Sequence, residues 1–244
     1  MSLVIEHNSV FENLVGTVAM IATVIQLVGP MGVVLEGIKR MEIKTFDFRF
    51  VLISVIDSGL WIVYGLKLTE FPVYLTHIAL FFIYLFFLNS IFWVNHEKDN
   101  MYKYSGMAII GFAIAYTVLP KNFAGFFAFI TKTGLNYFLV KKIQRALEKK
   151  NNEEMNLIEL QIALLASFLW LIYGLFLTNH AFIWIPNLIV LFITGMAVLT
   201  FFWTIDKIED NSILIIYLKK LFQVETSEEN SSKNFMNKKL NEDF

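Results

Sequence analysis

One ten-residue segment occurs twice in this sequence, and the second copy begins 109 positions after the first. Residues 60–69 read LWIVYGLKLT and residues 169–178 read LWLIYGLFLT, so seven of the ten letters are identical. In a strongly apolar chain, a repeat of this period indicates a duplicated membrane unit rather than a solenoid. We therefore expect two copies of one group of helices, joined by an additional helix that keeps the copies parallel.

The composition excludes several classes of protein. Hydrophobic residues make up 57% of the 244 residues and charged residues only 17%, whereas a soluble domain carries about 25% charge. The chain has no cysteine and its four histidines are scattered, so we expect no disulfide, no metal site and no cofactor. The net charge of -1 gives no reason to expect nucleic acid as a partner. We predict an all-α membrane protein.

Seven segments are apolar enough to be membrane helices, each of which needs about 20 residues to cross a ~30 Å hydrocarbon core. The first apolar run is flanked by His7 and Glu12 instead of basic residues, so we interpret it as a membrane helix and not as a cleavable signal peptide. The predicted spans are residues 13–35, 48–66, 71–94, 104–120, 123–140, 157–178 and 181–203.

These spans divide into a 3+1+3 arrangement. Residues after Trp203 alternate isoleucines with charges and then become rich in Ser, Asn, Lys and Glu. The first part of this tail fits either an amphipathic helix on the inner membrane surface or an extension of the last span, and we expect the end to be disordered. The predicted units are two parallel triple-helix bundles at 10–94 and 123–203, a linker helix at 104–120, and a cytosolic segment at 204–244.

Basic residues predict the orientation. Of the 20 lysines and arginines, only Lys67 and Lys121 fall in connections on one side, and Lys132 falls inside a span; all others lie on the opposite side. Because cytoplasmic loops carry the excess of Lys and Arg, we expect the N-terminus outside or in a lumen and the C-terminus in the cytosol. Whether the membrane is the plasma membrane or an internal one stays open.

Aligning the two halves by their sequences places spans one to three on spans five to seven. In the first helix of each half, Gly32 aligns with Gly134 at an offset of 102, and Lys39-Arg40 then aligns with Lys141-Lys142. In the third helix of each half, His77 aligns with Asn187 at an offset of 110.

The pattern resembles the SWEET family of sugar transporters and their half-size bacterial relatives, the SemiSWEETs, over about residues 10–203. The residues that carry this resemblance are Pro30 nine positions before Lys39, the two Trp-x-x-Tyr-Gly segments, and Phe182-Ile-Trp-Ile-Pro-Asn187. The resemblance implies a pocket near the membrane midplane, lined by an aromatic and an amide position from each half. By motif position these residues are Trp61, Trp170, His77 and Asn187.

The chemistry of these residue types fits a sugar. Two indole rings offer wide, rigid apolar surfaces and one N–H donor each, and an amide such as Asn187 both donates and accepts, as a hydroxyl requires. Other interpretations stay open. Trp61 and Trp170 would also fit interfacial anchors, and Asn187 would also fit a hydrogen bond to a neighbouring helix.

The chain departs from the family at its prolines. The family carries one proline in the first helix and one near the start of the second helix of each half, where they bend the helices and permit gating. Here Pro30 is retained, Phe50 and Lys132 occupy the second and third positions, and no proline lies near Glu159. Since proline loosens a helix, we expect a stiffer or differently hinged gate, with Gly32 and Gly134 supplying part of the flexibility.

Two charged residues fall deep in the predicted spans, Asp57 and Lys132. Facing lipid, each would cost about 2.5–3.5 kcal/mol at a helix centre. Opposite charges at similar depth are consistent with a salt bridge between the halves, with proton coupling that also involves His77, or with charges that line a cavity or snorkel. Imidazole titrates near neutral pH and also serves as a neutral hydrogen-bonding group.

These observations lead to one functional prediction and two alternatives. We predict a bidirectional facilitative transporter of mono- or disaccharides that works by alternating access, with a sugar and the lipid bilayer as partners and a homo-oligomer as an open question. The first alternative is a proton-coupled carrier of amino acids or another charged solute. The second is a seven-helix cargo receptor without flux. No nucleophile elbow or phosphate loop occurs, so we do not expect an enzyme.

Overall fold

The computed structural model describes residues 2–43, 47–149 and 155–205, with side chains described from residue 11 to residue 204. The predicted tail at 204–244 therefore lies outside the described residues except for its first two positions. Within the described ranges all of the regular secondary structure is helical. The elements are α1 (Ser2–Ile25), α2 (Val28–Arg40), α3 (Phe48–Leu68), α4 (Phe71–Val94), α5 (Lys98–Val118), α6 (Lys121–Lys149), α7 (Leu157–Ile172), the π-helix η1 (Tyr173–Leu177) and α8 (Ala181–Ile205).

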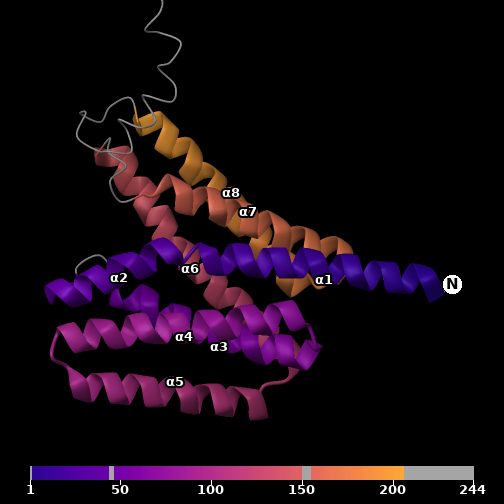
Figure 1. Cartoon of the computed structure of the whole chain (residues 1–244), viewed down its shortest axis with the longest axis horizontal. Helices are drawn as coiled ribbons and strands as arrows, with labels where there is room; N and C mark the ends of the chain where they lie inside the picture. Colours follow the sequence, from indigo (N-terminus) through magenta and orange to yellow (C-terminus); the bar gives the residue numbers. More distant parts are fainter. Residues whose placement is uncertain (1, 44–46, 150–154, 206–244) are drawn as a thin grey trace, which may run out of the picture.

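These elements form seven helices, because α1 and α2 are one rod with a bend and η1 continues α7. Helix α4 packs between α1 and α3 in the first half, and α8 packs between α7 and α6 in the second. The halves meet where α3 contacts α6 and where α1 contacts α7, so six helices close a ring with the same order in each half. Helix α5 lies outside this ring against α3 and α4 (Figure 1). The all-α membrane fold predicted from the sequence is confirmed.

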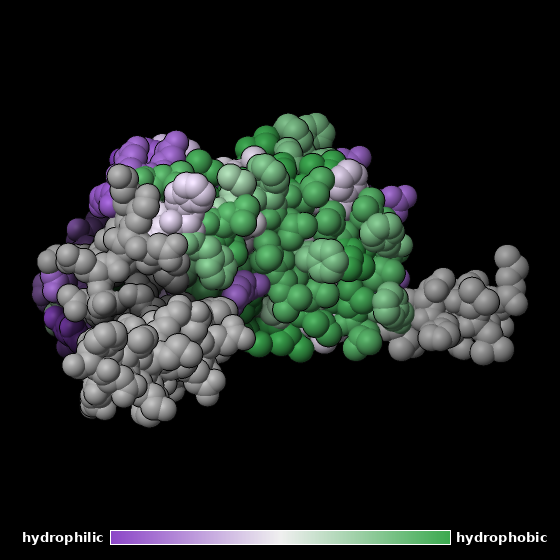
Figure 2. Space-filling view, turned by 90° about the horizontal axis from the view of Figure 1, so that it is seen from above, coloured by the Kyte–Doolittle hydropathy of each residue, from purple (hydrophilic) through white to green (hydrophobic). Residues whose placement is uncertain are grey.

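By length and composition, six of the described helices can cross a membrane: 11–40, 48–68, 71–94, 121–149, 157–177 and 181–204. Helix α5 is not among them, because its first turns carry Lys98, Asp99 and Lys103. Figure 2 shows a continuous hydrophobic surface on one face, with hydrophilic residues gathered toward the end of the molecule where α2 ends. A surface of this extent needs a bilayer to cover it.

The bend between α1 and α2 comes from Pro30. Proline has no N–H to bond the carbonyl of Gln26, and its ring crowds the preceding turn. The chain responds with a tight turn in which the N–H of Leu27 bonds the carbonyl of Val24, and α2 resumes with the N–H of Met31 on the carbonyl of Leu27. The bend predicted from the sequence at this position is thus present.

The π-helix η1 accounts for the change of offset between the halves. Gly65 and Gly174 are 109 positions apart, whereas α4 and α8 begin 110 positions apart, at Phe71 and Ala181. A π-helix holds one extra residue in a helical turn. The N–H of Thr178 bonds the carbonyl of Tyr173 over five residues, which absorbs the insertion without breaking the helix.

The hydrophobic core is shared at one end of the molecule and divided at the other. Where α3 and η1 end, buried residues from all the ring helices form one cluster, here called the shared cluster. Its members are Ala19, Trp61, Val63, Tyr64, Val73, Ala124, Ala128, Trp170, Tyr173 and Ile183. Toward the opposite end, the first half has its own cluster around Val51 and Phe87, and the second half has one around Leu157 and Phe201. Figure 1 shows α6, α7 and α8 running at an angle to α1–α5.

Glycines set the closest approaches in the shared end. A Cβ on Gly16 would lie 2.6 Å from the Pro72 ring and 2.8 Å from the Tyr173 ring. In the other half, a Cβ on Gly125 would lie 2.7 Å from the Tyr64 ring and 2.8 Å from the Phe182 ring. Gly16 and Gly125 therefore have equivalent surroundings and are 109 positions apart.

This equivalence corrects the sequence alignment of the first helices, which paired Gly32 with Gly134. Both of those glycines have no atom within 4 Å of an added Cβ, so neither reports on packing. The offset of 109 makes Lys132 the residue equivalent to Thr23, and Leu139 the residue equivalent to Pro30. The buried alanines Ala19 and Ala128 follow the same offset.

The contacts at the start of the second helices agree with the corrected register. The Phe50 ring packs edge-on against the Phe138 ring, with the ring centroids 5.4 Å apart. In the other half, the Glu159 carboxylate lies against Gly29, 2.5 Å from where a Cβ would be. Both residues of each contact are 109 positions from their counterparts. The sequence alignment had placed Lys132 at the third proline position of the family pattern, and this assignment was wrong. In the corrected register that position is occupied by Leu139.

We expect Gly65→Ala to destabilise the protein. An added Cβ would lie 2.8 Å from the backbone nitrogen of Tyr74, so α3 and α4 would have to separate, and overpacking of this kind costs about 1–3 kcal/mol. The thermal unfolding midpoint in detergent should fall by several degrees. Gly106→Ala on α5 is the matched control, because no atom lies within 4 Å of its Cβ position and alanine favours the helix. An unchanged midpoint for Gly65→Ala would contradict the close packing.

Candidate functional site

The two tryptophans of the repeated segment lie in the shared cluster, one from each half. Trp61 on α3 is 3% exposed and Trp170 on α7 is 7% exposed, and both are surrounded by residues of the opposite half as well as their own. Neither ring faces the lipid surface, unlike Trp203, which is 73% exposed. Interfacial anchoring is therefore not the role of Trp61 or Trp170 in this conformation.

His77 lies directly against Trp61. The two rings stack with centroids 5.3 Å apart and an interplanar angle of 14°. His77 is 8% exposed, and its Nδ1 has no hydrogen-bond partner; the same is true of the Trp61 Nε1. Buried polar atoms without partners are uncommon in folded proteins and call for a ligand, a water or a conformational explanation. Here two of them lie on adjacent rings.

Trp170 differs from Trp61 in this respect. Its Nε1 donates a hydrogen bond of 2.9 Å to the Thr23 Oγ1, from α7 across to α1. The Thr23 hydroxyl in turn donates to the carbonyl of Ala19 at 2.8 Å. Thr23 was not among the residues singled out from the sequence. Aligning α1 with α6 at the offset of 109 would have drawn attention to it, but the sequence alignment used an offset of 102 for these helices.

Asn187 uses its amide within its own helix. Its Nδ2 donates to the carbonyl of Ile183 at 2.7 Å, four residues earlier on α8, and the side chain is half-buried. The structure thus stacks His77 on Trp61, whereas the equivalent Asn187 is held by a hydrogen bond within its own helix.

Asp57 and Lys132 lie on facing helices of the two halves. Asp57 is 3% exposed, and its Oδ1 accepts a hydrogen bond of 2.7 Å from the Thr131 Oγ1 on α6. Lys132, the next residue, is half-buried and within electrostatic range of both Asp57 and His77. The buried carboxylate therefore has one hydrogen bond and one nearby positive charge, both from the opposite half.

The predicted hinge residues lie away from this group. Pro30 marks the bend before α2, and Gly32 and Gly134 are exposed helical positions with no packed neighbour. Phe50 packs between halves through Phe138 and also contacts Tyr84 on α4, with centroids 6.4 Å apart. Phe50 is thus the predicted hinge residue with contacts to both halves.

The end of the molecule next to the shared cluster is fastened by residues that the sequence analysis did not select. Glu70 precedes α4 in the first half. Its Oε2 accepts a hydrogen bond of 2.5 Å from the Tyr173 hydroxyl of η1, and its Oε1 lies 3.5 Å from the His180 Nε2. Both oxygens therefore bind the second half. The sequence signal was available, because Glu70 and His180 are 110 positions apart, the offset of α4 and α8.

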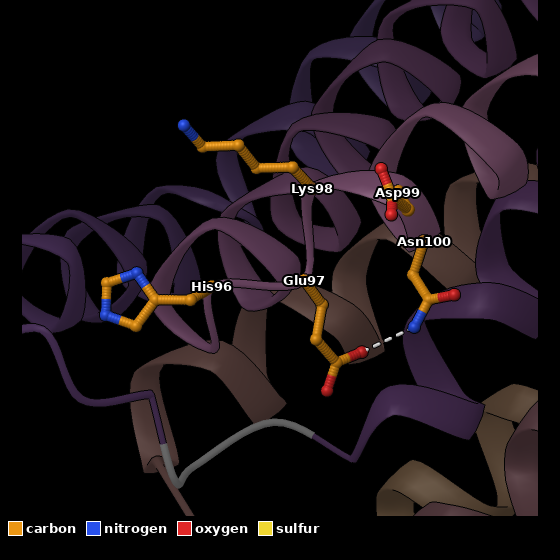
Figure 3. A pocket seen from close by; sticks show the side chains of 5 residues that line it. All are labelled: His96, Glu97, Lys98, Asp99 and Asn100. Carbon is orange, nitrogen blue, oxygen red and sulfur yellow. Dashed lines mark hydrogen bonds between the residues drawn. The ribbon is translucent and has the colours of Figure 1, made fainter.

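A hollow at the connection between α4 and α5 is unrelated to this site. It has a volume of about 390 Å³ and is lined by residues 96–100, among which the Asn100 Nδ2 donates to the Glu97 Oε2 at 2.7 Å (Figure 3). All of its lining comes from one connection, four of the five residues are exposed, and none has the wide apolar ring face that a sugar packs against. We assign it no ligand.

Two like groups of three helices, closed into a ring around buried residues from both, define an integral membrane protein that crosses the bilayer several times. A family model described as "Sugar efflux transporter for intercellular exchange" matches the chain twice, over residues 13–100 and 122–209, with both ends displaced by the same 109 positions. The chain belongs to this family, the SWEET sugar transporters, whose members are transporters and not enzymes.

The fold agrees with a solved structure. A eukaryotic SWEET transporter, determined at 3.7 Å resolution, superposes with a TM-score of 0.69 at 16% sequence identity, over 80% of this chain and 98% of that one. No curated protein sequence matches the chain. The resemblance stated from the two Trp-x-x-Tyr-Gly segments is confirmed.

We expect Tyr173→Phe to loosen the fastened end. Hydrogen bonds to charged groups contribute about 1.5–3 kcal/mol, and part of this is lost to solvent because Glu70 is partly exposed. Backbone hydrogen exchange of residues 66–74 and 174–184, measured in detergent, should accelerate about three- to tenfold. Tyr64→Phe is the matched control from the other half, since its hydroxyl makes no hydrogen bond with any residue that the structure describes. Equal exchange in both variants would contradict this role of Glu70.

Proposed function

We propose that the chain is a facilitative carrier that moves a neutral mono- or disaccharide in either direction by alternating access. Membership of a sugar transporter family supports the substrate class, and the buried pair of indoles from opposite halves supports the site. Indole faces pack against the C–H faces of a sugar ring. The unpartnered Trp61 Nε1 and His77 Nδ1 supply polar atoms that a hydroxyl can satisfy.

The way in which the halves touch supports alternating access. With Trp61 and Trp170 at 3% and 7% exposure, a sugar reaches them only if the halves separate. The halves share a core at the end fastened by Glu70 and have separate cores at the opposite end. Opening at the divided end costs less buried apolar area, so we infer that this conformation is closed at the Glu70 end.

The orientation that we propose places the Glu70 end outside the cell or in a lumen. The connections at this end carry Lys67 and Lys121, and the opposite end carries the remaining basic residues outside the spans. The N-terminus would then be outside and the C-terminus cytosolic. We also propose that residues 10–94 and 123–203 move as the two units, with the linker at 104–120 travelling with the first unit, against which α5 packs.

The charged group at Asp57 favours a second candidate, a proton-coupled carrier. A buried carboxylate, a lysine and an imidazole close together in one membrane site are typical of proton relays. Substrate uptake into vesicles with and without a pH gradient separates the two candidates. Uptake that equilibrates without a gradient and is not accelerated by one supports the facilitative carrier, and accumulation driven by the gradient supports coupling. A receptor would give no flux under either condition.

The observation that carries the proposal is the burial of Trp61 and Trp170 between the halves. We expect Trp61→Ala and Trp170→Ala each to lower the initial rate of sugar uptake at least tenfold at low sugar concentration, because each removes one face of the site. The test uses radiolabelled glucose, fructose and sucrose in transport-deficient cells, with membrane protein quantified. Trp203→Ala, at an exposed tryptophan, should transport like the unaltered protein. Normal uptake by both buried variants would refute the site.

A further inference from the structure

We propose that Thr23 is a positioning residue that gives the two tryptophans of the site different tasks, an inference that rests on the proposed transport of a sugar. Trp170 donates its single N–H to Thr23 and offers a substrate only its ring. Trp61 keeps its N–H free and supplies the directional hydrogen bond to a substrate hydroxyl. The walls of the site thus differ although the halves arose by duplication.

Thr23 is oriented to do this. Its hydroxyl hydrogen points to the carbonyl of Ala19 at 2.8 Å, which leaves the oxygen lone pairs facing the Trp170 N–H at 2.9 Å. An indole has one donor and no acceptor, so this bond consumes its whole hydrogen-bonding capacity. Because Thr23 belongs to the first half and Trp170 to the second, the bond also fixes the ring relative to the opposite half.

The equivalent position in the other half cannot do the same. The offset of 109 that relates Gly16 to Gly125 and Ala19 to Ala128 places Lys132 opposite Thr23. A lysine ammonium has three donors and no acceptor, so it cannot receive the N–H of Trp61. This substitution explains why the Trp61 Nε1 is buried without a partner while the Trp170 Nε1 is satisfied.

Asp57 does not replace the missing acceptor. Its carboxylate lies close to the Trp61 indole, one turn earlier on α3, but no hydrogen bond of proper geometry joins them, and Asp57 accepts from Thr131 instead. The residue equivalent to Asp57 in the second half is Ala166. The side of the site around Trp61 therefore has an indole N–H without a partner, the carboxylate of Asp57 and the ammonium of Lys132. The side around Trp170 has an indole N–H that is hydrogen-bonded, and Ala166 in place of the carboxylate.

A sugar hydroxyl that accepts from Trp61 would satisfy this donor. A donor left unpaired in a buried site costs more than a typical hydrogen bond contributes, so the gain on binding is concentrated on the Trp61 side. The Trp170 side then determines how flat and how apolar the bound face of the sugar must be. Selectivity for hydroxyl positions should accordingly follow changes near Trp61, and tolerance of ring shape should follow changes near Trp170.

The first test compares Thr23→Val, which keeps the shape and removes the hydroxyl, with Thr23→Ser, which keeps the hydroxyl. For whichever of glucose, fructose or sucrose the unaltered protein transports, we expect Thr23→Val to raise KM about three- to tenfold and Thr23→Ser to stay within about twofold. A normal KM for Thr23→Val, or the same loss in both variants, would overturn the positioning role. The amount of each variant in the membrane is measured alongside.

The second test reads the indoles directly and does not need transport. In the ¹⁵N–¹H spectrum of purified protein with labelled tryptophan, Trp61→Phe and Trp170→Phe assign the two indole N–H signals. We expect Thr23→Val to move the Trp170 signal and to accelerate its hydrogen exchange, with the Trp61 signal unmoved. An unmoved Trp170 signal overturns the inference whether or not a sugar is transported, so failure here is distinguishable from failure of the proposed function.

A third arm tests the division of tasks with the same two tryptophan variants. Each removes one N–H and part of one ring, so the lost apolar area is matched. We expect Trp61→Phe to raise KM at least threefold more than Trp170→Phe, because only Trp61 has an N–H free for the substrate. Equal effects, or a larger effect for Trp170→Phe, would overturn the assignment.

Discussion

The close approach of helices at four glycines holds the ring of six helices together, two of them between the halves and one within each half, and the rest of the structure depends on it. Gly16 and Gly125 admit the tyrosine rings of the opposite half, and Gly65 and Gly174 admit the backbone of the helix that follows. The segment Trp-x-x-Tyr-Gly encodes this arrangement on one face of a helix, since residues three and four apart are neighbours there. The tyrosine contacts the other half, the glycine permits the next helix, and the tryptophan one turn earlier faces the interior. One short motif thus specifies both the joint and the site.

On this common backbone the two halves have diverged in chemistry at matched positions. His77 in the first half corresponds to Asn187 in the second, Glu70 to His180, Asp57 to Ala166, and Thr23 to Lys132. The changes are complementary across the interface. Asp57 takes a hydrogen bond from the α6 residue beside Lys132, and Glu70 lies against His180. Charged groups in a membrane interior are costly unless they have partners, which explains why the charges face the opposite half and not lipid.

Much of the fold could be predicted from the sequence because it depends on local patterns. Continuous apolar runs gave the spans, the recurrence of Leu-Trp-x-x-Tyr-Gly predicted the duplication, and Pro30 predicted the bend. The rotation of α6 could not be obtained in this way. A glycine in an open helix position, such as Gly134, and one under a packed ring, such as Gly125, look alike in sequence, and only the second fixes register. Thr23 and Tyr173 were missed because their hydrogen-bond partners lie more than 100 residues away in the sequence. Glu70 and His180 stand at equivalent positions of the two halves, but the sequence does not show that they are in contact.

The residue inserted in η1 affects the free-energy difference between the two conformations through which a carrier of this kind passes. A carrier must pass between two conformations of similar free energy, and each 1.4 kcal/mol of preference for one of them shifts the populations about tenfold. The Tyr173–Glu70 bond fastens one end, with a contribution of about 1.5–3 kcal/mol before solvent is considered. In strict symmetry, Tyr64 would make a second such bond with an acidic residue in the other half. The chain has His180 at that position, and η1 displaces the connection by one residue. With one tyrosine–carboxylate hydrogen bond instead of two, the closed end costs less free energy to open.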